Sequence, residues 1–175
     1  MGIIETFTGR FQKSNQIIVG SVLGLHNIMR NKIVRFPCTV IYSRQSSDNE
    51  LKEFLKSSIQ YSLDHINKIV AFLKERGFNT PPTESLQRVL NDNGQFAVSR
   101  SIMDDKKISA IMREFLGLSL SIEAEAIRNA IEPDCRKLIY DILHTDNEEN
   151  YKLVCIQESK GWTDNSFPPY LGPPQ

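Results

Sequence analysis

Four long stretches of the sequence carry apolar residues at every third or fourth position, and this periodicity constrains the fold more than any other feature. Such spacing is typical of one face of an amphipathic α-helix. In the first stretch the apolar positions include Leu25, Met29 and Phe36. We therefore predict an all-α protein, with helices at about 14–42, 48–76, 104–131 and 134–160.

The four predicted helices are similar in length, about 27 residues or about 40 Å each. Similar lengths with one apolar face each favour an antiparallel up-down four-helix bundle of the ferritin-like kind. Residues 83–101 are less regular, so we expect a long connection between the second and third bundle helices that lies against the bundle; its residues 84–90 are compatible with a short helix. The proline-rich residues 161–175 predict an extended tail, and one domain spanning 1–175 suits the length.

Three local features set the expected helix boundaries. Pro37 interrupts the first helix, and we expect a kinked continuation because Val40 extends the same apolar face. Asp48 suits the start of the second helix. Thr145 and Glu148 have capping-box spacing, which leaves a break in the fourth helix open as an alternative.

Composition excludes several classes of partner. Lys plus Arg and Asp plus Glu each number 21, so the net charge is zero and no nucleic-acid partner is predicted. No window approaches the roughly 18–20 apolar residues that span a bilayer, so no membrane partner is predicted. Cys38, Cys135 and Cys155 form no Cys-x-x-Cys pair, which excludes zinc ribbons and thioredoxin-like chemistry. We expect them to be buried, reduced thiols in a cytoplasmic protein.

Polar residues lie within the apolar stripes, and they are the candidate site residues. On a helical wheel Glu123 falls near the middle of the third stripe, and Asp146 and Glu149 fall on the fourth. His65 and His26 fall at the edges of the second and first stripes, whereas His144 faces solvent. These positions predict a small polar cluster inside the bundle, made of Glu123, Glu149, Asp146, His65 and His26.

Carboxylate-bridged di-metal bundles use a Glu on each of two helices and Glu-x-x-His on each of the other two. Here the second helix has Ser62-x-x-His65 and the fourth has Asp146-x-x-Glu149, so neither pair is intact and a di-iron centre is not predicted. One divalent metal ion held by some of the candidate residues stays an alternative. Otherwise these groups are satisfied by hydrogen bonds or solvent, and Glu123 must either have a partner or reach water, because an unpaired buried carboxylate is costly.

Other chemistry has little support in the sequence. The basic run Arg30, Lys32 and Arg35 is interpreted as a charged face in solvent. The sequence lacks a Gly-x-x-x-x-Gly-Lys-Ser/Thr loop, a Gly-x-Gly-x-x-Gly loop and a Gly-x-Ser-x-Gly elbow. We therefore predict no catalytic and no organic cofactor-binding residues.

The fourth predicted helix ends in Lys160-Gly161-Trp162, and a Pro168-Pro169 pair follows after five further residues. Together with Gly24-Leu25-His26-Asn27 and a Glu-containing third helix, this end resembles a ferritin-like family of Bacillus-type spore formers. Members are sometimes labelled spore coat proteins, by similarity to coat protein F. The resemblance covers nearly the whole chain; it implies a ferritin-like bundle and no established reaction.

Two functional hypotheses follow. The first is a non-enzymatic structural or interaction protein without a cofactor, with spore-coat association implied by the resemblance. It predicts a homo-oligomer, or binding to other coat or structural proteins, through apolar residues beyond one stripe: Leu116, Leu118 and Leu120. The alternative is a ferritin-like bundle that binds a divalent metal ion or a small ligand in a degenerate carboxylate and histidine site.

Overall fold

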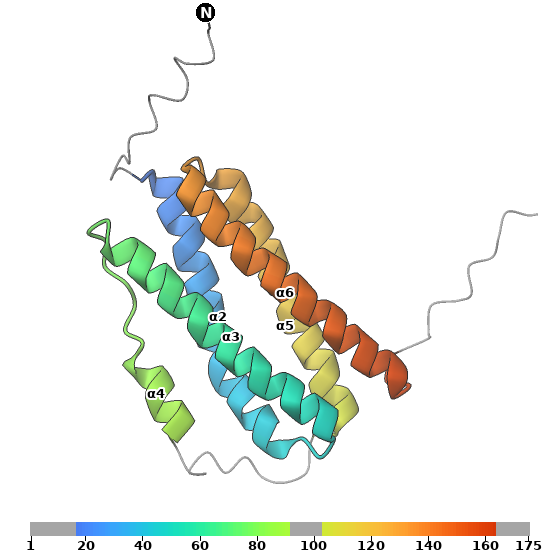
Figure 1. The fold of residues 1–175 in the computed structure, drawn as a ribbon. Helices are drawn as coiled ribbons and strands as arrows, with labels where there is room; N and C mark the ends of the chain where they lie inside the picture. The colour runs from blue at the N-terminus through green and yellow to red at the C-terminus, as the bar shows by residue number, and fades with distance from the viewer. Residues whose placement is uncertain (1–16, 92–102, 164–175) are drawn as a thin grey trace, which may run out of the picture.

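The computed structural model describes residues 17–91 and 103–163, and within these ranges it is helical with no strand (Figure 1). No helix in these ranges has the length and apolar character that crossing a membrane requires. The all-α expectation is confirmed. The helices are α2 (Val19–Gln45), α3 (Asn49–Lys74), α4 (Glu84–Asn91), α5 (Asp105–Asn129) and α6 (Pro133–Ser159).

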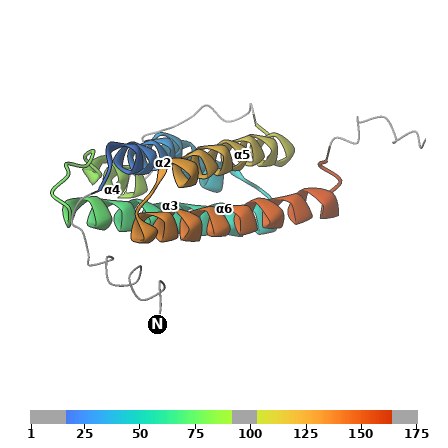
Figure 2. The ribbon, with the colours of Figure 1, turned by 90° about the horizontal axis from the view of Figure 1, so that it is seen from above.

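The four long helices lie in two layers, with α2 beside α5 in one and α3 beside α6 in the other (Figure 2). The layers are joined by contacts between α2 and α3 and between α5 and α6. The short helix α4 packs against α2. The expected connection that lies against the long helices is therefore present over α4, and residues 92–102 lie outside the described residues.

Contacts at the helix ends fix the direction of each helix. The backbone N–H of Ser47 donates to Asp105 at 3.0 Å, so the end of α2 lies beside the start of α5. The N–H of Ile18 donates to Glu132 at 2.6 Å, so the start of α2 lies beside the turn into α6. Neighbouring long helices are thus antiparallel. However, α3 and α5 run the same way (Figure 1).

The helix ends follow the local sequence. Asp48 caps α3 as expected, accepting a hydrogen bond from the N–H of Leu51 at 2.9 Å. Beyond α3 and α6 the chain turns at Gly77 and Gly161, whose φ angles are +79° and +66°. Glycine is favoured there because a Cβ atom strains the left-handed conformation.

Three boundary predictions have definite outcomes. Helix α2 continues through Pro37, as expected. It begins at Val19 rather than near 14, and residues 14–16 lie outside the described residues. The alternative of a break at Thr145 is wrong, because α6 is continuous there. The Thr145 hydroxyl donates to the carbonyl oxygen of Asp141 at 3.0 Å, so it bonds within the helix instead of capping a new one.

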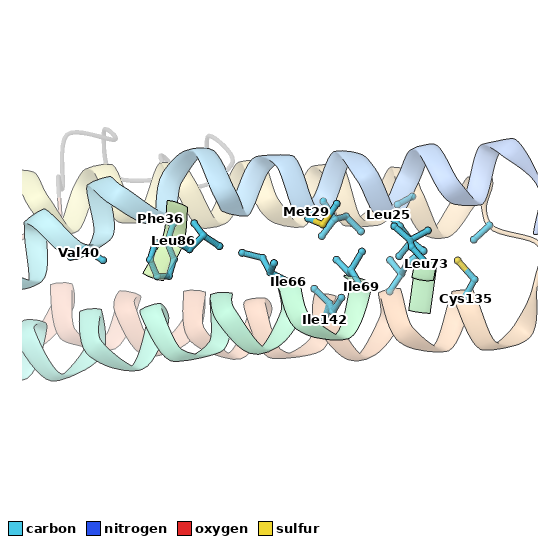
Figure 3. Close-up of a cluster of buried hydrophobic side chains, with 14 residues drawn as sticks. Leu25, Met29, Phe36, Val40, Ile66, Ile69, Leu73, Leu86, Cys135 and Ile142 are labelled. Atoms are coloured by element: carbon cyan, nitrogen blue, oxygen red, sulfur yellow. The ribbon is translucent and has the colours of Figure 1, made fainter. Parts of the chain in front are cut away.

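Two apolar clusters fill the space between the layers. In the first, Met29, Ile69 and Ile142 point toward a common interior (Figure 3). It comprises Leu25, Ile28, Met29, Phe36, Val40, Ile66, Ile69, Leu73, Leu86, Ala126, Ala130, Cys135, Ile139 and Ile142. The second cluster comprises Leu51, Phe54, Leu55, Ile108, Met112, Leu116, Leu153 and Ile156.

Two expectations about side chains need correction. Cys135 is buried, but Cys38 is half-buried and Cys155 is exposed, so the prediction of three buried thiols is wrong.

Leu116, predicted to lie outside the stripe, belongs to the second apolar cluster, whereas Leu118 is exposed. Leucines at every second position of a helix cannot all lie on one face, so only one side of this run packs into the core.

Candidate functional site

Each long helix contributes at least one buried titratable side chain to the interior between the two layers. These are Lys32 on α2, His65 on α3, Glu123 on α5 and Asp146 on α6, and we call them the polar layer. The helices turn these groups inward because each occupies a core position in its stripe. Glu123 is only 1% exposed and Lys32 only 6%. Groups this buried must be paired to remain charged.

The ammonium group of Lys32 lies between the two carboxyl groups. Its Nζ is 2.6 Å from Oδ2 of Asp146 and 3.4 Å from Oε1 of Glu123. The other oxygen of Asp146, Oδ1, is 3.4 Å from Nδ1 of His65. Asp146 is therefore the centre of the polar layer, with a lysine from α2 on one side and an imidazole from α3 on the other.

The two carboxyl groups have opposite pKa shifts. Burial, together with the nearby charge of Asp146, raises the pKa of Glu123 to about 8. Burial also raises the pKa of Asp146, but the nearby imidazole of His65 and the charge of Lys32 outweigh it and lower that pKa to about 2. At neutral pH we therefore expect Glu123 to be protonated and Asp146 ionised, as for two like charges sharing one site.

A small cavity of about 40 Å³ adjoins the polar layer. Buried Glu149 lines it with one oxygen, Oε1, bound by Lys152 Nζ at 2.8 Å and the other without a hydrogen-bond partner. The Oγ of Ser58 and one guanidinium nitrogen of Arg35, which also line the cavity, lack partners as well. A cavity of this size and polarity accommodates water molecules or one small ion.

Arg35 closes one side of this cavity from α2. Its Nη1 donates to the carbonyl oxygen of Phe115 and, at 3.1 Å, to Ser119 Oγ. The guanidinium carbon lies 5.0 Å from the centre of the Phe115 ring, within cation–π range. Arg35 thereby joins α2 to α5 beside the polar layer.

The structure brings most of the predicted residues to one place. Glu123, Asp146 and His65 belong to the polar layer, and Glu149 lines the adjoining cavity. His26 is half-buried on α2, and in the described ranges no hydrogen bond or ion pair joins it to the other four. Within residues 17–91 and 103–163, no three or more His, Cys, Asp or Glu side chains are grouped to hold a metal ion.

Lys32 is the residue that the sequence interpretation missed. The basic run was interpreted as a solvent face; Arg30 is exposed, but Lys32 is buried and Arg35 half-buried. The signal was present, since Lys32 lies four residues after buried Ile28 and four before buried Phe36. A lysine at a core position pairs with the carboxylates instead of projecting into water.

Comparison with known proteins identifies a fold but no family. No family model and no curated protein matches the sequence. Among solved structures, the chain resembles the crystal structure of a candidate spore coat protein from Bacillus halodurans C-125. The match has a TM-score of 0.73 and covers 90% of this chain and 96% of that chain, at 17% sequence identity. At this identity the two proteins share the arrangement of helices.

Proposed function

We propose that this protein is a non-enzymatic structural or interaction protein, a ferritin-like four-helix bundle associated with the spore coat. Antiparallel neighbouring helices with one long connection between α3 and α5 support the ferritin-like assignment, because such folds have one long crossover. The fold shared with the candidate spore coat protein of Bacillus halodurans supports the coat association.

The observation that carries this proposal is the position of Lys32. Carboxylate-bridged bundles hold metal ions between inward-facing acidic and histidine side chains. In this chain a lysine occupies the space between Glu123 and Asp146. The ion pair of Lys32 with Asp146, beside a protonated Glu123, balances the charge with the protein's own cation.

Binding a divalent ion here would require two changes. Glu123 would have to lose a proton that its environment retains up to a pH of about 8. Lys32 would also have to leave Asp146, its ion-pair partner at 2.6 Å. Both changes oppose metal binding.

Metal analysis of protein purified without chelators tests this proposal. We expect less than about 0.1 equivalent of any transition metal in the wild type, because Lys32 already neutralises the site. Lys32→Ala removes the competing cation and should increase Co²⁺ binding measured by absorption spectroscopy. Near-stoichiometric wild-type metal that Glu123→Gln abolishes, and that the exposed control Glu114→Gln retains, would contradict the proposal.

Coat association needs a separate test. Fractionation of spores from the source organism, with detection by antibody, should recover the protein in the coat extract. Recovery only from vegetative cells would contradict this part of the proposal, without bearing on the metal-free polar layer.

A bundle that binds a small ligand is the second candidate, and the cavity beside Glu149 favours it. Ser58, Arg35 and Glu149 present unpartnered buried polar atoms in one cavity of about 40 Å³. Calorimetric titration with Mg²⁺ and Mn²⁺ tests it, comparing Glu149→Gln with the exposed control Glu148→Gln. Binding that only Glu149→Gln weakens would favour this candidate over the first.

A further inference from the structure

The outer side of the layer formed by α2 and α5 has a groove of about 560 Å³. Leu23, Arg30 and Val34 line its α2 wall, and Ile122 and Glu125 line its α5 wall. The groove is separated from the polar layer, because these residues alternate along the helices with those that face the core. The groove is therefore not part of the polar layer or of the cavity beside it.

The groove is flanked by exposed apolar side chains. Leu23 is 57% exposed and Val34 66%, and Leu118, one helical turn before Ile122, is 54% exposed. Within the described residues, α3 carries no exposed large apolar side chain, and α6 carries Tyr140 and Tyr151, which lie eleven residues apart. A gathering of exposed apolar groups on one face is typical of a protein interaction surface.

The charges of the groove favour a second copy of this chain as the occupant. Arg30 and Glu125 are exposed on opposite walls, and no ion pair involving either is found among the described residues. One face thus offers both a cation and an anion, as a two-fold symmetric interface requires. The zero net charge of the chain removes overall repulsion between copies.

The spacing along α2 also suits self-association. Leu23, Asn27, Arg30 and Val34 are separated by four, three and four residues, a pattern that is the same in both directions. When two copies of α2 lie antiparallel, Leu23 of each faces Val34 of the other. The two apolar ends of the groove are then covered at once by a single symmetric contact.

The same pairing brings the charges together. Gly24 lies against Ala126, and Asn31 donates to Ser119 at 3.0 Å, so within one chain Arg30 and Glu125 are offset along the helix axis. A two-fold axis that passes α2 midway between Leu23 and Val34 places Arg30 of the second copy opposite Asn27 of the first. It then lies nearer the level of Glu125 than Arg30 of the same chain does.

We propose that the α2–α5 groove is a homodimer interface in which two copies of this chain dock with α2 antiparallel to α2. The apolar contacts are between Leu23 and Val34, and Arg30 of each copy pairs with Glu125 of the other. The inference rests on the proposed structural function, because it names the surface through which such a protein assembles.

Sedimentation velocity over a range of concentrations tests the interface. The full-length wild type should dimerise reversibly, and Leu23→Glu or Val34→Glu should raise the dissociation constant by at least about tenfold, or about 1.4 kcal/mol. The matched controls Tyr140→Glu and Tyr151→Glu, exposed residues on α6, should leave it unchanged. Circular dichroism should show equal helix content in all variants, since every substituted side chain is exposed.

Charge reversal gives a second readout. Arg30→Glu and Glu125→Arg should each weaken the dimer, and the double variant should restore it, because the pair is re-formed with its signs exchanged. Dimerisation weakened by Tyr151→Glu but unaffected by Leu23→Glu would overturn the groove as the interface and leave self-assembly intact. A monomer at every concentration would overturn the inference, while metal bound through Glu123 would overturn the proposed function alone.

Discussion

The polar layer and the first apolar cluster occupy neighbouring parts of the same interior, yet they are held together by different forces. In the apolar cluster, side chains such as Ile69 and Leu73 gain by leaving water, and any close-packed set of similar volume suffices. In the polar layer, the buried Lys32 ammonium is stabilised by the carboxyl groups beside it, Asp146 at 2.6 Å and Glu123 at 3.4 Å. The comparison shows that one region depends on volume and the other on pairing.

Removing one member of the ion pair should have the largest effect, and it tests whether the polar layer depends on pairing. Asp146→Ala leaves Glu123, 3.4 Å away, as the remaining carboxyl group beside the Lys32 ammonium, and the free energy of unfolding should fall by roughly 3 kcal/mol, the low end of the range for a broken buried pair. Replacing both residues with apolar ones of similar volume, Lys32→Met with Asp146→Leu, should cost far less or even stabilise the fold. Urea denaturation measures both, and equal losses in the two variants would show that pairing is not what the layer depends on.

The pKa of Glu123 predicts a pH dependence that the apolar clusters cannot produce. Because the folded-state pKa is raised from 4.5 to about 8, the folded protein binds a proton more tightly than the unfolded chain. This contribution is fully present below about pH 4.5 and is lost as pH rises through 8. Stability should therefore fall between pH 5.5 and 8.5, by roughly 3 kcal/mol.

Glu123→Gln should remove that fall, because an amide does not titrate in this range. Denaturation at the two pH values measures it, with Glu114→Gln as the exposed control on the same helix. The lowered pKa of Asp146 acts at the other end of the scale, where its contribution is lost as pH falls from 3.8 toward 2. A wild type whose stability is flat between pH 5.5 and 8.5 would contradict the assignment of a protonated Glu123, and so would an equal effect of Glu114→Gln, an exposed change on the same helix outside the groove.

A conservative change in the first apolar cluster should have the smallest effect. Ile69→Val removes one buried methylene and should cost about 0.5–1.5 kcal/mol, without changing the pH dependence. Thermal and urea unfolding measure the loss. The matched control, Ile131→Val, removes the same group from a side chain that is 71% exposed and should shift stability by less than about 0.5 kcal/mol.

The sequence predicted the long helices well because their periodicity is strong and local. It also placed Glu123, Asp146 and His65 in the interior, since each occupies a stripe position. Lys32, the partner of these groups, is not predicted to be buried, because lysines are exposed far more often than buried. Its four-residue spacing from Ile28 is the signal for its buried position.

Other features depended on contacts between distant residues. The first turn of α2 has no side-chain cap of its own; Glu132, 114 residues after Ile18, accepts the hydrogen bond from its backbone. The shared direction of α3 and α5 likewise has no local signal, because periodicity gives helix lengths but not directions. Such features need the tertiary structure.

Lys32 and the two acidic side chains beside it come from opposite halves of the polypeptide. The first half, α2 with α3, carries the cation and the imidazole, and the second half, α5 with α6, carries both carboxyl groups. Neither half alone can neutralise the charge it would bury. The two hairpins should therefore recognise each other in one alignment only, since sliding either by a single helical turn would strand these groups among hydrocarbon side chains.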